Sequence, residues 1–487
     1  MSRSGVARAL AIGIVVMLAT GFAVFAGPGV WRAVSGSDEP SARSTTAVPG
    51  AAPADTPTPT VVPTTAPPVL DSAADPAAVG AVTGPSAAGL ETALSDYVAA
   101  STLGPGPGVA VAAGQGALLF DVDATTPRTP ASTTKILTAT AALGSLGPDT
   151  RFTTSVELTA AGQIVLVGGG DPALSQRTAP DETWPFPVTS LDDLARRTAA
   201  ALQSSGLSSV TLAYRTDLFG GPDVSPDWAG AYVSAGQVGP LSALAVDGGR
   251  EQPGLALRTL DPAVYTARLF AELLGSYGVT VQADPQSVTS TSATSKAGTQ
   301  IATSQSPTVA DLVAQLLVRS DNDVAEVLAH HVARAEGEEP TFAGASRAVT
   351  AVLNRLGVPT DGLVLQDGSG LSRGNLVSPA TLVATLQLAL ADDHPELRPV
   401  LAGLPIAGFN GTLMDRFADV ESATQVGDIR AKTGYLSGVV SLAGYVVDEQ
   451  GQPLVFAVMA DRVSDDPGAA QQSADRLAAA LASCGCR

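Results

Sequence analysis

Histidine is scarce in this chain of 487 residues, and its scarcity disfavours two classes of site. The three histidines, His330, His331 and His394, show no metal-ligand spacing with cysteine or glutamate. We interpret them as ordinary helix or surface residues. A Ser-His-Asp hydrolase needs a histidine at its centre, so that mechanism is disfavoured as well. The sequence gives no sign of a metal or an organic cofactor.

Cysteine is scarcer still, with Cys484 and Cys486 as the only two, both at the C-terminal end. In an oxidising compartment they can close a tight disulfide, and otherwise they remain a free pair. The sequence favours neither alternative. No activating partner stands beside them, so we expect neither to be catalytic.

Positive charge is in deficit, because the formal net charge is −19 and the isoelectric point is near 4.4. Nucleic acid is a polyanion and would be repelled by such a chain. No basic stripe offsets this balance, so the sequence excludes nucleic acid as a partner.

Charge is absent altogether from Ala9 to Trp31, directly after Arg3 and Arg8. At roughly 1.5 Å per residue this run is long enough to cross a hydrocarbon core of about 30 Å. Positive residues stay in the cytoplasm, so the remainder of the chain is expected outside it. We favour a membrane anchor, with cleavage of a signal peptide near Ala26 as the alternative.

Aromatic residues are missing between Trp31 and Tyr97. The segment from Arg32 to Ser86 consists mostly of Ala, Thr, Pro, Ser and Val, which cannot bury enough apolar surface to fold. We expect a disordered stalk over residues 32–86, with the folded part beginning at Ala87.

The folded part shows the periods of both helices and strands. Helical spacing occurs at 90–101, 262–278, 309–334 and 469–482, and strands are expected within 108–124, 429–434, 439–448 and 453–462. Short β-rich runs, interrupted by one helix, fill residues 152–302. The pattern predicts an α+β fold in which helices flank an antiparallel sheet.

Lysine occurs only three times, as Lys135, Lys296 and Lys432, and its positions are informative. Lys135 follows Ser132 by three residues at the start of an expected helix, so the two side chains share a face. In isolation the pair would be an N-cap serine and a solvated lysine. Lys432 opens a Lys-Thr-Gly motif at the end of an expected strand, and Ser320-Asp321-Asn322 lies between two expected helices.

The order Ser-x-x-Lys, Ser-Asp-Asn, Lys-Thr-Gly resembles that of the penicillin-recognising serine enzymes, which comprise penicillin-binding proteins and serine β-lactamases. The stretches "LVGGGDPAL", "DGSGLSRGNLVSP" and "LPIAGFNGTL" are similar to segments of the class C, type 4 low-molecular-mass penicillin-binding proteins. The resemblance implies a transpeptidase-like domain over residues 87–151 and 303–487, with residues 152–302 inserted.

The resemblance also implies a role for each motif residue. Ser132 is the nucleophile that forms an acyl-enzyme, and Lys135 is its base. A free lysine has a pKa of about 10.4, so burial, the helix N-terminus and the charge of Lys432 are expected to lower the pKa of Lys135. Ser320 and Asn322 relay the proton to the leaving group and hold the substrate amide.

The Lys-Thr-Gly strand is expected to bind the substrate. Lys432 and Thr433 receive its carboxylate, Gly434 completes the motif, and the N–H groups of Ser132 and Tyr435 form the oxyanion hole. Tyr435 departs from the small hydroxyl residue common at this position in the family. Three further residues in Gly-rich stretches are interpreted as parts of tight turns and not as catalytic groups: Asp171, Asp367 and Ser369.

We therefore expect a D-Ala-D-Ala carboxypeptidase or endopeptidase that acts on peptidoglycan stem peptides and binds β-lactams. One alternative is a serine β-lactamase, but no motif between Lys135 and Ser320 supplies the activated carboxylate that such an enzyme usually shows. The other is a non-catalytic wall-binding scaffold, which the intact motifs disfavour. The sequence decides neither the balance of the two peptidase activities nor the oligomeric state.

Overall fold

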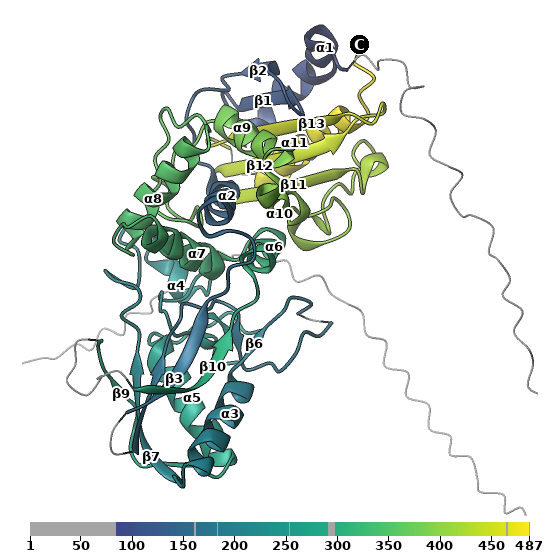
Figure 1. The fold of residues 1–487 in the computed structure, drawn as a ribbon. Coiled ribbons are helices and arrows are strands. Elements are labelled where there is room, and N and C mark those ends of the chain that lie inside the picture. Colours follow the sequence, from purple (N-terminus) through teal and green to yellow (C-terminus); the bar gives the residue numbers. More distant parts are fainter. Residues whose placement is uncertain are drawn as a thin grey trace, which may run out of the picture. The chain divides into compact units, whose positions relative to one another are not determined.

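The computed structural model of the chain describes residues 84–486, apart from 160–161, 183, 253, 291–297 and 464–465 (Figure 1). The expected membrane run, and the expected stalk up to residue 83, lie outside the described residues. Within the described part, no helix combines the length and the apolar character needed to span a bilayer.

A five-stranded antiparallel sheet, with strand order β11-β12-β13-β1-β2, lies at the centre of the part that carries the motifs (Figure 1). Its strands are β1 (Gly108–Ala113), β2 (Leu118–Val122), β11 (Ile429–Leu436), β12 (Val439–Val447) and β13 (Pro453–Ala460). The antiparallel sheet expected from the sequence is therefore confirmed. One detail is corrected: Lys-Thr-Gly does not end its strand, because β11 continues to Leu436.

Both faces of this sheet are covered, and the strand residues alternate between two cores. On β1, Val109 and Val111 pack into one cluster, and Ala110 and Ala112 into the other. Side chains point to opposite faces with a period of two, so each strand serves both cores. This is why β12 and β13 have nearly continuous apolar sequences.

Helices cover the two faces. The pair α1 (Ala87–Val98) and α11 (Pro467–Ala482) joins one core. The remaining helices of this part join the other core: α2 (Thr134–Leu146), α6 (Val309–Arg319), α7 (Asn322–Ala335), α8 (Phe342–Arg355), α9 (Pro379–Leu390) and α10 (Arg398–Ala402). Flanking helices on an antiparallel sheet confirm the predicted α+β class.

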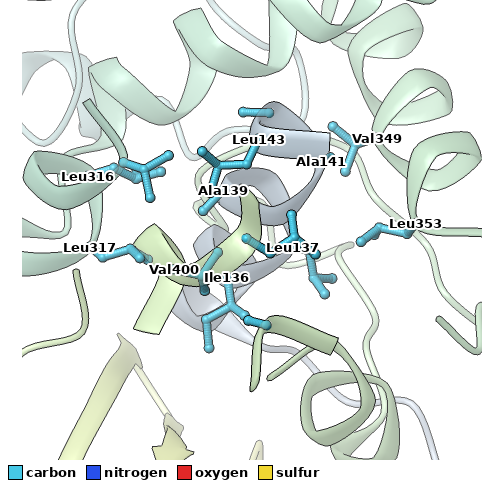
Figure 2. Packing of buried hydrophobic residues seen from close by; sticks show 14 of the residues in the cluster. Ile136, Leu137, Ala139, Ala141, Leu143, Leu316, Leu317, Val349, Leu353 and Val400 are labelled. Atoms are coloured by element: carbon cyan, nitrogen blue, oxygen red, sulfur yellow. The ribbon is translucent and has the colours of Figure 1, made fainter. Parts of the chain in front are cut away.

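Helix α2 is the most enclosed of these helices, since every residue from Thr134 to Leu143 is buried. Figure 2 shows Ile136, Leu137 and Leu143 of α2 among side chains of α6, α8 and α10. A helix that is enclosed all round is held by packing on every face. The first turn of α2 is therefore a rigid place for a reactive side chain.

A second sheet occupies residues 153–305, which we call the second-sheet segment. Its strands are β3 (Thr153–Leu158), β4 (Gln163–Val167), β7 (Ser209–Arg215), β8 (Thr280–Val281), β9 (Gln286–Ser287) and β10 (Thr299–Gln305). Strands β3, β4 and β10 pair antiparallel, whereas β7 pairs parallel with β4, β8 and β9.

Helices α3 (Leu191–Ser204) and α5 (Pro262–Ser276) share a core with this sheet. Only α5 is expected from the sequence. Helix α3 was missed although Ser190 caps it and its apolar residues form a stripe. Its four charged residues, Asp192, Asp193, Arg196 and Arg197, lie between the apolar positions and leave the stripe intact, so the local sequence does contain a helix signal.

Short elements connect these parts. They are α4 (Ala231–Ser234), the paired β5 (Leu174–Ser175) and β6 (Thr189–Ser190), and the 3₁₀ turns Ser101–Leu103, Ala131–Thr133, Val246–Gly249, Pro395–Leu397, Gly411–Leu413 and Ala423–Gln425.

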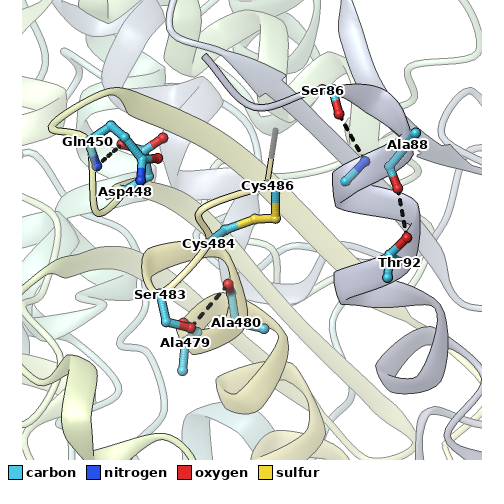
Figure 3. The surroundings of a disulfide bond; sticks show 11 residues. Ser86, Ala88, Thr92, Asp448, Gln450, Ala479, Ala480, Ser483, Cys484 and Cys486 are labelled. Atoms are coloured by element: carbon cyan, nitrogen blue, oxygen red, sulfur yellow. Dashed lines mark hydrogen bonds between the residues drawn. A yellow bond between two sulfur atoms is a disulfide. The ribbon is translucent and has the colours of Figure 1, made fainter. Parts of the chain in front are cut away.

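The C-terminal end meets the start of the folded part. Cys484 and Cys486 are joined by a disulfide (Figure 3). The Ser86 N–H donates to the carbonyl oxygen of Cys486 at 2.6 Å, and the Ser86 hydroxyl accepts from Gly89 N to cap α1. Of the two alternatives that the sequence left open for the cysteines, the structure has the bonded pair.

Candidate active site

The expected nucleophile lies in a short 3₁₀ turn, Ala131–Thr133, that leads directly into α2. Ala131 has a φ of 49°, which a residue with a Cβ rarely adopts. Such a conformation costs on the order of 1–3 kcal/mol and persists only where the surroundings impose it. The carbonyl oxygen of Pro130 accepts from the hydroxyls of Thr133 at 2.7 Å and Ser441 at 2.6 Å, which fixes the loop.

Lys135 is fully buried, and its ammonium nitrogen has three acceptors. Nζ donates to the Ser132 hydroxyl oxygen at 2.9 Å, to Asn322 Oδ1 at 2.7 Å and to the Ser369 carbonyl oxygen at 2.6 Å. An ammonium has three hydrogens, so each is used. Residues from three distant parts of the sequence thus converge on one nitrogen.

Burial is the main cause that lowers the pKa of Lys135, to about 8. Removing an ammonium from water destabilises its charged form. The carboxylates of Asp367 and Glu326 act in the opposite direction. Of the causes expected from the sequence, burial is thus the dominant one.

The Ser369 carbonyl is aimed at Lys135 by a buried turn, 367–372. The two oxygens of Glu326 accept from the N–H groups of Gly368 at 3.0 Å and Ser369 at 2.9 Å. Asp367 accepts from Gly370 N, Ser372 N, Asn375 Nδ2 and Trp228 Nε1. The interpretation of Asp367 as a turn residue is therefore confirmed, and the turn itself supplies an acceptor to the site.

Burial, together with the neighbouring Asp367, raises the pKa of Glu326 to about 8. Glu326 lies beneath the turn and contacts the site only through the backbone of Gly368 and Ser369. It escaped the sequence analysis because it belongs to no motif.

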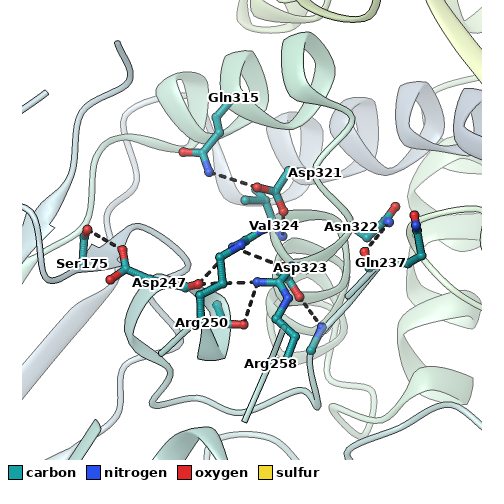
Figure 4. A network of polar contacts seen from close by, with 12 residues as sticks. Ser175, Gln237, Asp247, Arg250, Arg258, Gln315, Asp321, Asn322, Asp323 and Val324 are labelled. Carbon is teal, nitrogen blue, oxygen red and sulfur yellow. Dashed lines mark hydrogen bonds and ion pairs between the residues drawn. The ribbon is translucent and has the colours of Figure 1, made fainter. Parts of the chain in front are cut away.

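The Ser-Asp-Asn motif forms the junction between α6 and α7, as expected. Ser320 ends α6 with a φ of 56°, and the Asp321 side chain caps α7 through Val324 N at 3.2 Å. Asn322 is the first residue of α7. Its Oδ1 faces Lys135, and its Nδ2 donates to the carbonyl oxygen of Gln237 at 2.7 Å (Figure 4).

The second-sheet segment therefore holds Asn322 in place. A second contact lies next to it, because Asp323 accepts from Gly239 N at 2.7 Å and from the buried Arg258 guanidinium at 2.5 Å (Figure 4). Neither Gln237 nor Arg258 could be predicted from the sequence. Gln237 acts through its backbone carbonyl, and Arg258 acts through an ion pair with Asp323, which is distant in the sequence.

Ser320 is less directly connected than the sequence predicts. Its hydroxyl has no hydrogen bond to Ser132, Lys135 or any other described residue. The structure thus joins Ser132, Lys135 and Asn322 by hydrogen bonds, and Ser320 makes none to this group.

Lys432 is fully buried on β11, and its ammonium nitrogen donates to the Thr433 carbonyl oxygen at 2.9 Å. Burial lowers the pKa of Lys432 well below its usual value, and the charge of Lys135 adds to this effect. The two lysines repel each other, so a proton on one disfavours a proton on the other. The Thr433 hydroxyl donates to the Thr412 hydroxyl at 2.9 Å.

Gly434 allows β11 to approach the nucleophile loop. A Cβ at this position would stand 2.0 Å from Ser441 Oγ and 2.5 Å from the Pro130 carbonyl oxygen. Only glycine fits here without moving one of them. The third motif is therefore packed against the first through the residue that lacks a side chain.

Strand β11 is an edge strand, and only its first half is covered on the outer side. The segment 405–407 pairs with it there, through Ala407 N to Ile429 O and Ala431 N to Pro405 O, both at 3.0 Å. No comparable backbone pairing to the outer edge of residues 432–436 occurs among the described residues. Tyr435 is 49% exposed.

The histidines lie apart from these groups. His330 and His331 are buried in α7, where burial lowers the pKa of each to about 4, and His331 stacks on Phe152. His394 contacts Glu396. Over the described residues no group of three metal-ligating side chains occurs.

Comparison with known proteins agrees with this geometry. The sequence profile of the D-Ala-D-Ala carboxypeptidase 3 (S13) family matches residues 90–256 and 250–481. The chain is 36% identical over 408 residues to carboxypeptidase DacB of Mycolicibacterium smegmatis, covering 82% of this chain and 85% of the relative. It is 31% identical to a D-alanyl-D-alanine carboxypeptidase of Actinomadura, covering 72% and 76%.

Among solved structures, penicillin binding protein 4 from Haemophilus influenzae is similar in fold, with a TM-score of 0.64 at 22% identity. The match covers 80% of this chain and 97% of that one. On the strength of the profile match and of the sequence relatives, the chain belongs to the D-Ala-D-Ala carboxypeptidase 3 (S13) family, as its resemblance to the class C penicillin-binding proteins implied.

Proposed function

We propose that the chain is a serine-type D-Ala-D-Ala carboxypeptidase that acts on peptidoglycan stem peptides through an acyl-enzyme and is acylated by β-lactams. The observation that carries this proposal is the contact of Lys135 Nζ with the Ser132 hydroxyl oxygen, in a buried setting that weakens the hold of the amine on its proton. The names of the sequence relatives support the reaction class.

The acylation step follows from this contact. The neutral amine of Lys135 takes the proton of Ser132, and the oxygen forms a bond to the substrate carbonyl carbon while the peptide bond to the leaving D-alanine breaks. With a pKa near 8, roughly one molecule in ten has the neutral amine at pH 7. An ordinary lysine would be neutral in far fewer than one in a hundred.

Binding of the substrate to Lys432 increases the fraction of molecules in which the Lys135 amine is neutral. The terminal carboxylate of the substrate binds Lys432 and the Thr433 hydroxyl, and its negative charge favours the protonated form of Lys432. Because the two buried lysines repel each other, a proton on Lys432 favours the neutral form of Lys135. Carboxylate recognition is thereby linked to activation of the nucleophile.

The uncovered half of β11 provides a place for the peptide backbone of the substrate. An extended peptide can pair with a free strand edge. The N–H groups of Ser132 and Tyr435 then form the oxyanion hole. The tyrosine side chain points into solvent, so its contribution comes from the backbone. Asn322 holds the substrate amide, and the Ser320 hydroxyl passes the proton from Lys135 to the leaving nitrogen once the substrate is bound.

The location of the enzyme follows from its substrate and from its N-terminal sequence. Stem peptides of the wall lie outside the cytoplasmic membrane. The uncharged run from Ala9 to Trp31 anchors the chain, and residues 32–86 act as a spacer between membrane and enzyme.

A labelled penicillin and a soluble stem peptide ending in D-Ala-D-Ala test the proposed function. We expect stable covalent labelling and D-alanine release by the wild-type chain, and neither by Ser132→Ala, which is folded but lacks the nucleophile. Ser145→Ala, a serine of α2 that bonds Glu336, is the matched control and should behave as wild type.

Three results would contradict this reading. Labelling of a folded Ser132→Ala chain removes the nucleophile assignment. Rapid turnover of the label indicates a β-lactamase, and absence of labelling in wild type indicates a scaffold. Mass-resolved products from cross-linked wall fragments then separate removal of terminal D-alanine from cleavage of cross-links.

The coupling of the two lysines predicts the pH dependence of acylation. In wild type the rate should fall about tenfold per pH unit below pH 8, because Lys135 becomes protonated. In Lys432→Met the lost repulsion raises the pKa of Lys135, so this acidic limb should move to higher pH. The rate at its plateau should also fall about 10–100-fold, since the substrate carboxylate loses a charged partner.

The measurement is the second-order acylation rate from pH 5 to 10. Lys296→Met is the control, because it changes the one lysine that lies outside the three motifs, and its profile should match wild type. A slower Lys432→Met enzyme with an unmoved acidic limb would show that Lys432 anchors the carboxylate but has no part in activating Lys135.

The close approach at Gly434 predicts a strong effect of a single methyl group. In Gly434→Ala the Cβ displaces the Pro130 carbonyl or Ser441, and the nucleophile loop moves with them. A shift of about 1 Å at a reacting group costs roughly 100-fold in rate. Gly230→Ala is the control, since no atom lies within 4 Å of its Cβ position and its φ is −57°. Equal acylation rates for the two variants would refute the packing argument.

A further inference from the structure

A cavity of about 300 Å³ lies where the second-sheet segment meets the junction of α6 and α7. Asp321 and Asp323, which flank Asn322 in the sequence, both line it. The Asn322 side chain instead contacts Lys135. The Ser-Asp-Asn junction thus supplies one side chain to the active site and its neighbours to the cavity.

Every carboxylate in the cavity wall already has a donor on each of its two oxygens. The donors stand at 2.5–3.3 Å and are Gly239 N and Arg258 for Asp323, Val324 N and Gln315 for Asp321, and Ser175 Oγ and Gln176 N for Asp247. The carboxylates are therefore all hydrogen-bonded within the protein, and none of those that line the cavity is free to bind a cation.

The three guanidinium groups that line the cavity are less completely paired than its carboxylates. Arg177 is paired with Asp181, and Arg250 donates to the Asp247 carbonyl oxygen at 2.9 Å while standing 4.0 Å from Asp323. Arg319 lies 4.3 Å above the centre of the Trp184 ring, and it forms no ion pair with any described carboxylate.

Arg319 is thus a partly solvent-exposed cation that lines the cavity, has an aromatic neighbour and forms no ion pair among the described residues. Burial lowers its pKa, and although Asp321 opposes this, the charges of Arg250 and Arg177 act in the same direction as burial. Three guanidinium groups therefore face the same space closely enough to repel one another. An anion placed between them would relieve that repulsion.

The geometry selects the kind of anion. A guanidinium is a planar fork that matches a carboxylate with two parallel hydrogen bonds. Trp184, whose ring lies beneath the guanidinium, also lines the cavity and adds apolar surface to it. A volume of about 300 Å³ is at the lower end of small-molecule sites, which suits the last residue or two of a peptide.

We propose that this cavity binds the carboxylate end of a short peptide, with Arg319 as its charged partner and Trp184 as its apolar wall. In peptidoglycan this ligand is the end of a stem peptide other than the one that reacts with Ser132. That identification rests on the proposed function. The enzyme would then hold two neighbouring peptides, one on each side of the Ser-Asp-Asn junction.

Fluorescence of Trp184 reports the cavity directly and needs no catalysis. The full chain is titrated with N-acetyl-D-alanine and with its neutral amide, and Trp184→Phe identifies which part of the signal comes from Trp184. We expect a saturable change with the acid and binding roughly tenfold or more weaker with the amide.

Variants separate this cavity from the active site. Arg319→Gln should weaken binding of N-acetyl-D-alanine roughly tenfold or more, and Arg319→Lys should lie between it and wild type because it keeps the charge but loses the fork. Arg268→Gln is the matched control, since Arg268 is an exposed arginine of the second-sheet segment and is paired with Asp284. Lys432→Met should bind as wild type.

The proposal is overturned by equal binding of acid and amide, by wild-type binding in Arg319→Gln, or by loss of binding in Lys432→Met, which would place the ligand at the active site. If the melting temperature shows that Arg319→Gln does not fold, the weaker binding expected for Arg319→Lys tests the same prediction. A chain that binds N-acetyl-D-alanine through Arg319 but is not labelled by penicillin would refute the proposed function and leave the cavity assignment standing.

Discussion

The buried ammonium group of Lys135 is the interaction on which the rest of the site depends. Its three hydrogen bonds reach Ser132 on the loop before α2, Asn322 at the start of α7 and the Ser369 carbonyl in the turn 367–372. A buried charge without partners would cost several kcal/mol. The protein therefore has to bring these three segments together, and the geometry needed for catalysis follows from that requirement.

The second-sheet segment takes part in this arrangement although it carries none of the three motifs. The Gln237 carbonyl orients the Asn322 amide, and the ion pair of Arg258 with Asp323 fastens the same junction one residue further on. A simple role as a spacer does not require such contacts. The segment instead supports the position of Asn322 and, with the α6–α7 junction, encloses the cavity that contains Arg319.

Much of the catalytic part could be predicted from the sequence, because its signals are local. The spacing of Ser132 and Lys135 places both on one helical face, and the apolar alternation of β12 and β13 predicts a hairpin. The Ser-Asp-Asn junction was placed correctly between two helices.

Other features of the site could not be predicted, because they depend on contacts between distant residues that no local sequence pattern indicates. The carbonyls of Ser369 and Gln237 act through the backbone, which any residue type shares. The need for glycine at position 434 arises from Pro130 and Ser441, far away in the chain. Helix α3 is an exception, because its Ser190 cap and its unbroken apolar stripe are local signals that predict a helix.

The titration of Lys135 tests the central claim most directly, and the scarcity of lysine makes it practical. With ¹³C at the ε position of lysine, the chain gives only three side-chain resonances, and single Lys→Arg or Lys→Met variants assign them. The account predicts that the Lys135 resonance titrates near pH 8 and the Lys432 resonance well below 10.5. A Lys135 resonance that titrates near 10.5 would contradict the account, because the amine next to Ser132 would then be a protonated ammonium at neutral pH and no base.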